Sequence, residues 1–285
     1  MEPDSLKHHI EDICRVSKFL DPEEFQPYDL KGAKLEEYLA YSNKRLDIVR
    51  SKFEERGFKA DLQEFSHYGF RVANAVFKKG ESGDETWFVA HHDYCAGLGA
   101  EDDASGLAVM IEIARHFKDS EIGEKLVFAS FDLEERGLLG SEYFVNHLPK
   151  ESRKKIRYVI DLECLGSGKD ITICKKVYGA KSDKRLVKKI QKTASDLGYN
   201  FIPEKYGFFW ADHVPFARKG IRVAEICSVD YSAYRMFGGK VAPDREDGSI
   251  AHTVRDLPEN IDADNLVKVG KTLVNLVESE YFESF

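Results

Sequence analysis

Residues 87–93 read WFVAHHD, an apolar run that ends in two histidines and an aspartate. Two later stretches follow the same plan: residues 125–135 read KLVFASFDLEE, and residues 156–163 read IRYVIDLE. Each stretch is an apolar run of strand length that ends in ionisable side chains. Amphipathic segments with helical spacing separate the three. We therefore predict parallel strands whose carboxyl ends bring these side chains to one edge of a sheet.

The rest of the chain predicts an α/β fold with a mixed, largely parallel central sheet and helices on both faces. Apolar residues at helical spacing predict helices, namely residues 5–19, 33–57, 105–117, 138–148, 181–197, 213–219 and 262–279. Apolar or alternating runs predict strands, namely residues 61–65, 71–77, 85–90, 125–131, 156–162, 171–174, 201–206 and 223–226. The first three strands resemble a meander. We expect one domain over residues 1–285, with the helices of residues 5–57 packed on it.

Composition excludes several classes of protein. A hydrophobic content of 42% supplies a packed core, and a formal net charge of −8 argues against nucleic acid as a partner. The basic run at residues 181–192 is typical of the solvated face of a helix. No apolar segment is long enough to predict a membrane span or a signal peptide, so we expect a cytoplasmic protein. A homo-oligomer is compatible with this composition.

The five cysteines form no CxxC pair and do not indicate a disulfide framework or a thiolate zinc site. Cys95 and Cys164 lie near the ionisable clusters in sequence. We interpret them as small buried apolar residues, which is the usual state of a free cysteine.

The histidine pair that ends the run at residues 87–93 contains a candidate metal ligand. Asp93 stands two positions beyond His91, on the same side of an extended chain. A carboxylate beside a ligating imidazole fixes its tautomer and raises its basicity. We therefore predict that His91 binds metal and that Asp93 orients it. His92 points the other way, into the packing of the sheet or the rim of a substrate site.

Two acidic clusters add carboxylates. Residues 99–106 read GAEDDASG, a turn that leads into a helix, and Asp102 is the preferred candidate for a carboxylate that bridges two cations, ahead of Asp103 and Glu101. A helix cap is the alternative interpretation. Glu134 and Glu135 follow an apolar strand, and adjacent residues of an extended chain face opposite ways. One can bind metal while the other accepts a proton from water.

The ordered set of motifs resembles the co-catalytic zinc aminopeptidase family. That family includes bacterial leucyl aminopeptidase and is related to glutamate carboxypeptidase II and glutaminyl cyclase. The motifs are HHD, GAEDDASG, EERGLLGS, the acids that end residues 156–163, ADH at residues 211–213 and HT at residues 252–253. The resemblance runs from about residue 74 to the C-terminus and implies a zinc-exopeptidase (phosphorylase/hydrolase-like) fold.

Carried over by position, the resemblance implies a two-zinc centre. Its metal ligands would be His91, Asp102, Glu135, Glu163 and His252, with Asp102 bridging the two ions. Glu134 would be the general base and Asp93 would orient His91. Co²⁺ or Mn²⁺ would be substitutes for Zn²⁺. Asp212 matches an acid that lies close to the site in the family, and a helix cap is the other interpretation of it.

Two departures bear on the substrate. Where many family members carry aspartate, this chain has Glu163, with Asp161 as the alternative ligand, and glutamate occurs there in relatives that act at carboxyl termini. The tract at residues 228–250 precedes His252, where the family places part of its substrate pocket. Its aromatic residues would line that pocket or pack over the edge of the sheet.

The predicted function is therefore that of an exopeptidase, an aminopeptidase acting on peptides. The alternatives are a one-zinc glutaminyl-peptide cyclotransferase, a carboxypeptidase or amide hydrolase of the same clan, and a non-catalytic relative.

Overall fold

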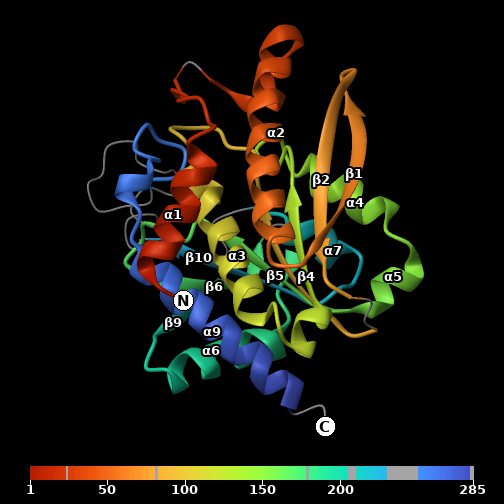
Figure 1. Cartoon of the computed structure of the whole chain (residues 1–285), viewed down its shortest axis with the longest axis vertical. Coiled ribbons are helices and arrows are strands. Elements are labelled where there is room, and N and C mark those ends of the chain that lie inside the picture. Colours follow the sequence, from red (N-terminus) through yellow and green to blue (C-terminus); the bar gives the residue numbers. More distant parts are fainter. Residues whose placement is uncertain (24, 81–82, 178–179, 205–209, 230–249, 283–285) are drawn as a thin grey trace.

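The computed structural model describes the chain except residues 24, 81–82, 178–179, 205–209, 230–249 and 283–285. An eight-stranded mixed sheet forms its centre (Figure 1). The strands are β1 (Lys59–His67), β2 (Phe70–Lys78), β3 (Glu85–His91), β4 (Leu126–Phe131), β5 (Ile156–Glu163), β6 (Asp170–Cys174), β9 (Phe201–Glu204) and β10 (Val223–Val229). Their order across the sheet is β1-β2-β4-β3-β5-β10-β6-β9. A separate small ribbon pairs β7 (Lys176–Val177) with β8 (Ala180–Lys181).

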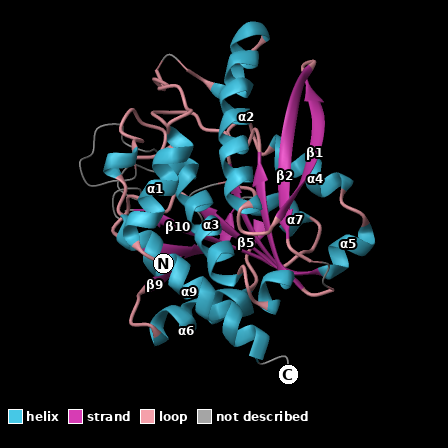
Figure 2. Cartoon of the chain, in the orientation of Figure 1, coloured by secondary structure: helices cyan, strands magenta, loops and turns pink. Residues whose placement is uncertain are grey.

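Helices enclose this sheet (Figure 2), which confirms the predicted fold class. They are α1 (Pro3–Cys14), α2 (Gly32–Glu54), α3 (Ser105–Phe117), α4 (Leu139–His147), α5 (Lys150–Lys155), α6 (Lys184–Asp196), α7 (His213–Arg218) and α9 (Ala263–Phe282). The described residues also form short helical turns, namely η1 (Pro27–Asp29), η2 (Ala100–Ala104), η3 (Glu121–Lys125) and η4 (Pro258–Asn260). The first helix ends at Cys14, five residues before the predicted end at residue 19, and α5 was not predicted.

The predicted meander of the first three strands is wrong. β2 pairs antiparallel with β4, and β3 lies between β4 and β5, parallel to both. The chain leaves β3 through α3 and returns as β4, which is the crossover that parallel neighbours require. That crossover places β4 on the side of β3 where a meander would put β2.

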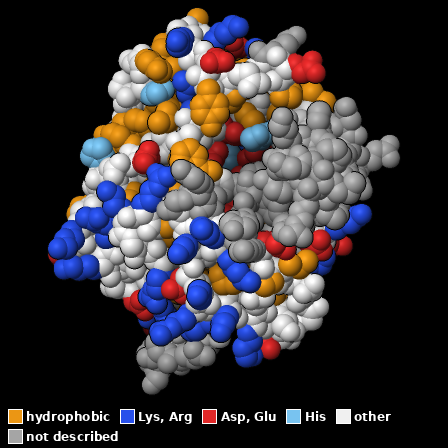
Figure 3. All heavy atoms as spheres, turned by 180° about the vertical axis from the view of Figure 1, so that it is seen from behind, with side chains coloured by type: hydrophobic (Ala, Val, Ile, Leu, Met, Phe, Trp, Pro, Cys, Tyr) orange, Lys and Arg blue, Asp and Glu red, His pale blue; other side chains and the backbone are white. Residues whose placement is uncertain are grey.

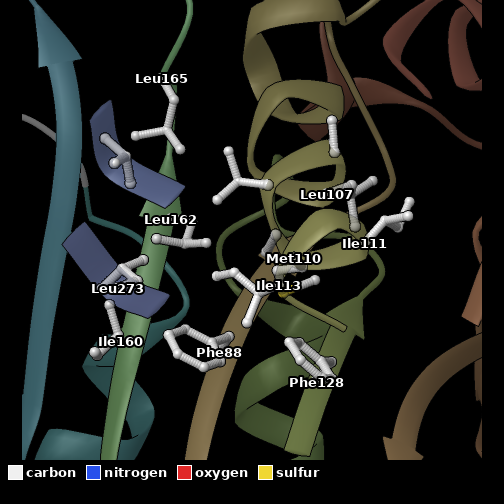
Figure 4. Close-up of a cluster of buried hydrophobic side chains, with 14 of the residues drawn as sticks. Phe88, Leu107, Met110, Ile111, Ile113, Phe128, Ile160, Leu162, Leu165 and Leu273 are labelled. Carbon is white, nitrogen blue, oxygen red and sulfur yellow. The ribbon is translucent and has the colours of Figure 1, made fainter. Parts of the chain in front are cut away.

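Alternation along the strands builds a core on each face of the sheet. Phe88 of β3 and Phe128 of β4 are buried on one face with α1, α2, α3, α6 and α9. Figure 4 shows them beside the apolar side chains of α3. Their neighbours Trp87 and Val127 lie on the other face, under Phe144 of α4 and Phe216 of α7. Both faces of β3 and β4 are therefore covered, which explains why their sequences are continuously apolar.

The basic segment near residue 190 folds as α6, in agreement with the prediction of a solvated helical face. Asp183 caps its N-terminus and accepts hydrogen bonds from the backbone N–H groups of Arg185 and Leu186, both at 2.9 Å. Its buried residues are Leu186, Val187, Ile190 and Ala194, and its lysines largely face solvent. Among the described helices, none combines the length and the apolar character needed to cross a bilayer.

Candidate metal centre

The carboxyl ends of three parallel strands deliver the candidate ligands to one edge of the sheet. His91 is the last residue of β3 and Glu163 is the last residue of β5. Glu134 and Glu135 stand three and four residues after the end of β4 at Phe131. Asp102 lies in the turn η2 that leads into α3. Because β3, β4 and β5 are neighbours in the sheet, residues up to 72 positions apart in sequence meet in space.

The two carboxylate oxygens of Asp102 face different histidines. Its Oδ1 lies 2.8 Å from His91 Nε2, and its Oδ2 lies 3.0 Å from His252 Nε2. Glu163 Oε1 lies 3.6 Å from His91 Nε2, and Glu135 Oε2 lies 3.2 Å from His252 Nε2. We call His91, Asp102 and Glu163 the inner position, because His91 is fully buried. His252, Asp102 and Glu135 form the outer position, because the His252 side chain is 48% exposed.

The donor atoms of this cluster fit divalent cations. Among the described residues, four of its buried atoms lack a hydrogen-bond partner: His91 Nε2, Asp102 Oδ1, Glu135 Oε1 and Glu163 Oε2. Polar atoms buried without partners are costly, so such a convergence is rare in a folded protein. Imidazole nitrogen and carboxylate oxygen are donors that suit Zn²⁺ and similar ions. A cation at each position would satisfy these four atoms.

Asp93 links His91 to the turn after β4 that carries Glu134 and Glu135. His91 Nδ1 lies 3.1 Å from the Asp93 backbone oxygen and 3.3 Å from its Oδ1, so a proton on Nδ1 leaves Nε2 free to bind an ion. The same carboxylate accepts the backbone N–H groups of Glu134 at 3.1 Å and Glu135 at 3.2 Å. The Tyr38 hydroxyl donates to it at 2.9 Å. One buried side chain therefore sets the relative place of the inner and outer positions.

A cavity of about 170 Å³ opens above the two positions. Glu134 lines it together with Asp102, Glu135, Glu163 and His252, and Tyr28, Gly137 and Trp210 complete the wall. Figure 3 shows a hollow that holds acidic and histidine side chains, with hydrophobic side chains along one side of it. The Glu134 carboxylate is partly buried and belongs to neither position. It is placed to exchange a proton with a molecule in the cavity.

The charges of the cluster act strongly on one another. Burial favours a higher pKa for Asp102, but His252 and His91 outweigh it and hold that pKa below its ordinary value. Burial raises the pKa of Glu134 well above its usual range, opposed by His91 and reinforced by Glu163. Cations at the two positions would favour the ionised carboxylates, because a nearby positive charge lowers a carboxyl pKa.

A model of peptidase family M28 matches residues 75–277, which contain all the residues of this cluster. The chain belongs to peptidase family M28. The matched region begins in β2 and ends in α9, so it includes every strand that carries a candidate ligand.

Curated M28-like relatives share moderate identity with the chain. Aminopeptidase YwaD of Bacillus subtilis is 28% identical over 204 residues, which cover 70% of this chain and 41% of that protein. Leupeptin-inactivating enzyme 1 of Streptomyces exfoliatus is 28% identical over 193 residues, which cover 66% of this chain and 43% of that enzyme. The chain thus spans less than half the length of these two relatives.

Solved structures share the fold. A zinc aminopeptidase from Bacillus subtilis superimposes with a TM-score of 0.62 at 25% identity, covering 74% of this chain and 51% of that chain. Glutaminyl cyclase from Porphyromonas gingivalis gives a TM-score of 0.75 at 21% identity and covers 98% of both chains. The second likeness concerns the fold alone.

Two acids that this M28 chain places outside the cluster hold its two ligand segments together. Glu101 Oε2 accepts the backbone N–H groups of Ile250 and Ala251, both at 2.8 Å, directly before His252. In return, the Asp256 carboxylate accepts the backbone N–H of Glu101 at 2.5 Å and that of Asp102 at 3.3 Å. The turn that carries Asp102 and the segment that carries His252 are therefore fixed to each other by reciprocal carboxylates.

Replacing Glu101 with alanine is expected to weaken binding of a divalent cation at the outer position by about 10–100-fold, the usual effect of losing an outer-shell partner. The two backbone donors before His252 would lose their shared acceptor. Zinc or cobalt titration of the purified variant measures the effect. Glu101→Gln keeps an oxygen that can accept the same bonds and should recover most of the affinity. Unchanged affinity in a folded Glu101→Ala variant would show that the bonds do not position His252.

Asp161 and Glu163 are alternative candidates, and the structure places them differently. Asp161 Oδ2 accepts the backbone N–H of His213 at 2.8 Å and lies 2.9 Å from its Nδ1. Two residues further along β5, about 6.6 Å at the usual rise of a strand, Glu163 reaches His91 Nε2. Asp161 Oδ2 is therefore engaged by α7, while its Oδ1 is buried without a hydrogen-bond partner among the described residues. Glu163 is the acid that lies beside His91 Nε2 in the inner position.

His92 and Asp212 have other surroundings, whereas a carboxylate oxygen of Asp103 lies within 4.8 Å of ligand atoms of His91 and Glu163. His92 Nδ1 lies 2.8 Å from Ser130 Oγ, within the packing of the sheet as predicted. Asp212 is buried but makes no side-chain cap bond to α7, so the cap interpretation is wrong. Asp103 accepts the backbone N–H of Gly106 at 3.1 Å and that of His91 at 3.3 Å. It supports the start of α3 and the end of β3.

Sequence reasoning missed Tyr38 and Asp256. Tyr38 lies in the predicted helix of residues 33–57, and the sequence gives no sign that its hydroxyl has a partner 55 residues away. Asp256 stands in a polar loop and reaches a partner 155 residues away. The tract at residues 228–250 is predicted to contribute to the substrate pocket. Its residues 230–249 lie outside the part of the chain that the structure describes.

Proposed function

We propose that this chain is a two-zinc exopeptidase that removes N-terminal residues from peptides. The proposal rests on Asp102, whose two carboxylate oxygens face the histidines of two separate ligand groups. A carboxylate placed in this way suits a bridge between two cations. Kinship with family M28 supports peptide hydrolysis, and the aminopeptidase relatives support attack at the amino terminus.

The residues of the chain divide the chemistry among them. Bound zinc would supply a Lewis acid that lowers the pKa of water to about 7 and polarises the scissile carbonyl. Glu134 would accept the proton of the attacking water at its carboxylate and deliver it to the leaving amine. Asp93 would keep His91 in the tautomer that binds through Nε2. The walls of the cavity would exclude bulk water from the reacting bond.

The charge of the cavity supports an amino-terminal substrate. Asp102, Glu134, Glu135 and Glu163 all line it, and a free α-amino group is cationic. A cavity of about 170 Å³ holds a small part of a peptide rather than an extended segment. A carboxylate terminus would meet the same acids, and we find no described lysine or arginine on that wall to receive it.

A substrate panel tests the proposal. The metal-free protein, reloaded with Zn²⁺, Co²⁺ or Mn²⁺, is assayed with aminoacyl-p-nitroanilides, free peptides, N-acetylated peptides and glutaminyl peptides. We expect hydrolysis of substrates with a free amino terminus, loss of activity on chelation, and two metal equivalents per chain. Cleavage of N-acyl amino acids would indicate a carboxypeptidase instead. Ammonia release from glutaminyl peptides with one metal equivalent would indicate a cyclotransferase.

A further inference from the structure

Cys95 lies at the outer position. Its sulfur, a Glu135 carboxylate oxygen and a His252 ring nitrogen all lie within 4.8 Å of one another. The cysteine is 7% exposed, and Glu135 is 6% exposed with Oε1 lacking a hydrogen-bond partner among the described residues. Three donor atoms from three separate segments therefore surround one point, and one of them is an unsatisfied buried carboxylate oxygen.

The loop that carries Cys95 is fixed against the segment that carries His252. The Leu98 backbone N–H donates to the Asp256 backbone oxygen at 2.8 Å. At Gly97 the two segments approach so closely that an added Cβ would stand 2.5 Å from that same oxygen. Gly97 also exchanges two backbone hydrogen bonds with Leu20, both at 2.8 Å. The place of Cys95 beside the outer position is therefore set by the backbone on both sides.

The surroundings of Cys95 differ from those of an ordinary buried cysteine. Cys14 and Cys174 belong to hydrophobic clusters of the core. Cys95 belongs to no such cluster of the described residues and faces an imidazole and a carboxylate. Cys164 offers a useful contrast: its sulfur donates to Glu163 Oε1 at 3.4 Å and so contacts a ligand of the inner position.

We propose that Cys95 is a sulfur ligand of the cation at the outer position, together with Asp102, Glu135 and His252. This inference rests on the proposed metal centre. As the sulfur–metal bond forms, the thiol proton passes to solvent water, and no electron is transferred. A sulfur donor makes the outer position selective for thiophilic divalent ions such as Zn²⁺, Co²⁺ and Cd²⁺ over Mn²⁺. At the inner position Cys164 Sγ also lies within 4.8 Å of carboxylate oxygens of Asp102 and Glu163. That sulfur donates a hydrogen bond to Glu163 Oε1 at 3.4 Å, so we assign the sulfur ligand to the outer position.

The two positions then differ in how much coordination the protein supplies. Cys95, Asp102, Glu135 and His252 would supply four protein ligands to the outer cation, the number typical of structural zinc sites. Three at the inner position leave room for water, as in catalytic zinc sites. The outer cation would therefore be held more tightly than the inner one. The effect of removing its sulfur ligand can be measured without any assay of activity.

Cobalt absorption of the full-length protein tests the ligand directly. Metal-free protein is titrated with Co²⁺, whose visible d–d bands report binding and whose near-ultraviolet sulfur-to-cobalt band reports a thiolate ligand. We expect both signals from the unchanged chain. Cys95→Ser should keep the visible bands and lose the near-ultraviolet band. Its affinity for cobalt should fall by at least ~10–100-fold, the effect of losing a residue that only hydrogen-bonds to a metal ligand. Cys14→Ser, in the apolar core, is the matched control, and Cys164→Ser tests the sulfur beside the inner position. Both variants should retain the near-ultraviolet band.

Two results would overturn the inference, and a third would contradict the metal centre on which it rests. Visible cobalt bands without the near-ultraviolet band would show a metal centre that lacks a sulfur ligand, and the proposed function would stand. Loss of the near-ultraviolet band in Cys164→Ser rather than Cys95→Ser would assign the thiolate to the inner position. Failure of the unchanged chain to bind cobalt would contradict the metal centre and the proposed function together.

Discussion

Replacing Glu134 with glutamine is expected to lower the rate of hydrolysis by about 10²–10⁴-fold, the usual contribution of a general base. The amide has almost the same shape but cannot accept the proton of the attacking water. Glu134 faces the cavity and belongs to neither the inner nor the outer position, so the variant should keep its metal. The measurement pairs kcat on an aminoacyl-p-nitroanilide with metal content per chain.

The matched control for this variant is Glu151→Gln, on the exposed surface of α5. It should change neither the rate nor the metal content. Near-wild-type turnover in Glu134→Gln would remove Glu134 as the base. Loss of metal in that variant would instead make Glu134 a ligand, and the roles of the Glu134–Glu135 pair would have to be exchanged.

Replacing Asp102 with asparagine should abolish binding of both ions. Each carboxylate oxygen serves a different position, and the amide offers one oxygen without the negative charge. The loss of metal affinity should exceed the ~10–100-fold that follows removal of a residue that only hydrogen-bonds to a metal ligand. Zinc at 100 times its Kd stabilises the folded chain by about 2.7 kcal/mol. That stabilisation should disappear, so zinc should no longer raise the Tm of the variant.

Glu163→Gln provides the comparison for Asp102→Asn, because Glu163 belongs to the inner position alone. It should lose one metal equivalent where Asp102→Asn loses two, as measured by metal analysis after gel filtration. Loss of a single equivalent from Asp102→Asn would show that this carboxylate does not bridge the two positions.

The parallel part of the sheet could be predicted from the sequence because its strands are continuously apolar. β3 and β4 are buried on both faces, and each ends abruptly in charged residues. The order of β2, β3 and β4 could not be predicted. Which strands become neighbours depends on how the chain crosses over from one strand to the next. The local sequence pattern of a strand is the same whichever neighbour it has.

The ends of helices were predicted less well than their existence. α1 stops at Cys14, where the chain turns toward the loop that contacts Gly97. The apolar spacing continues beyond that point, so the pattern alone extended the helix. Beyond the helix, Leu20 pairs with Gly97, 77 residues further along the chain. Such a contact has no local signature.

By itself the sequence determined which residue types stand at the ends of the apolar runs, and therefore that imidazoles and carboxylates gather at one edge of a sheet. It also pointed to His91 over His92, since side chains alternate along a strand. The tertiary structure decided how those residues are grouped. It divided Asp102 between two histidines, turned Asp161 toward His213 and brought Cys95 to the outer position. The physical reason is that these contacts join segments far apart in the chain, so only the packing of the whole sheet and its loops determines which donor atoms share a cation.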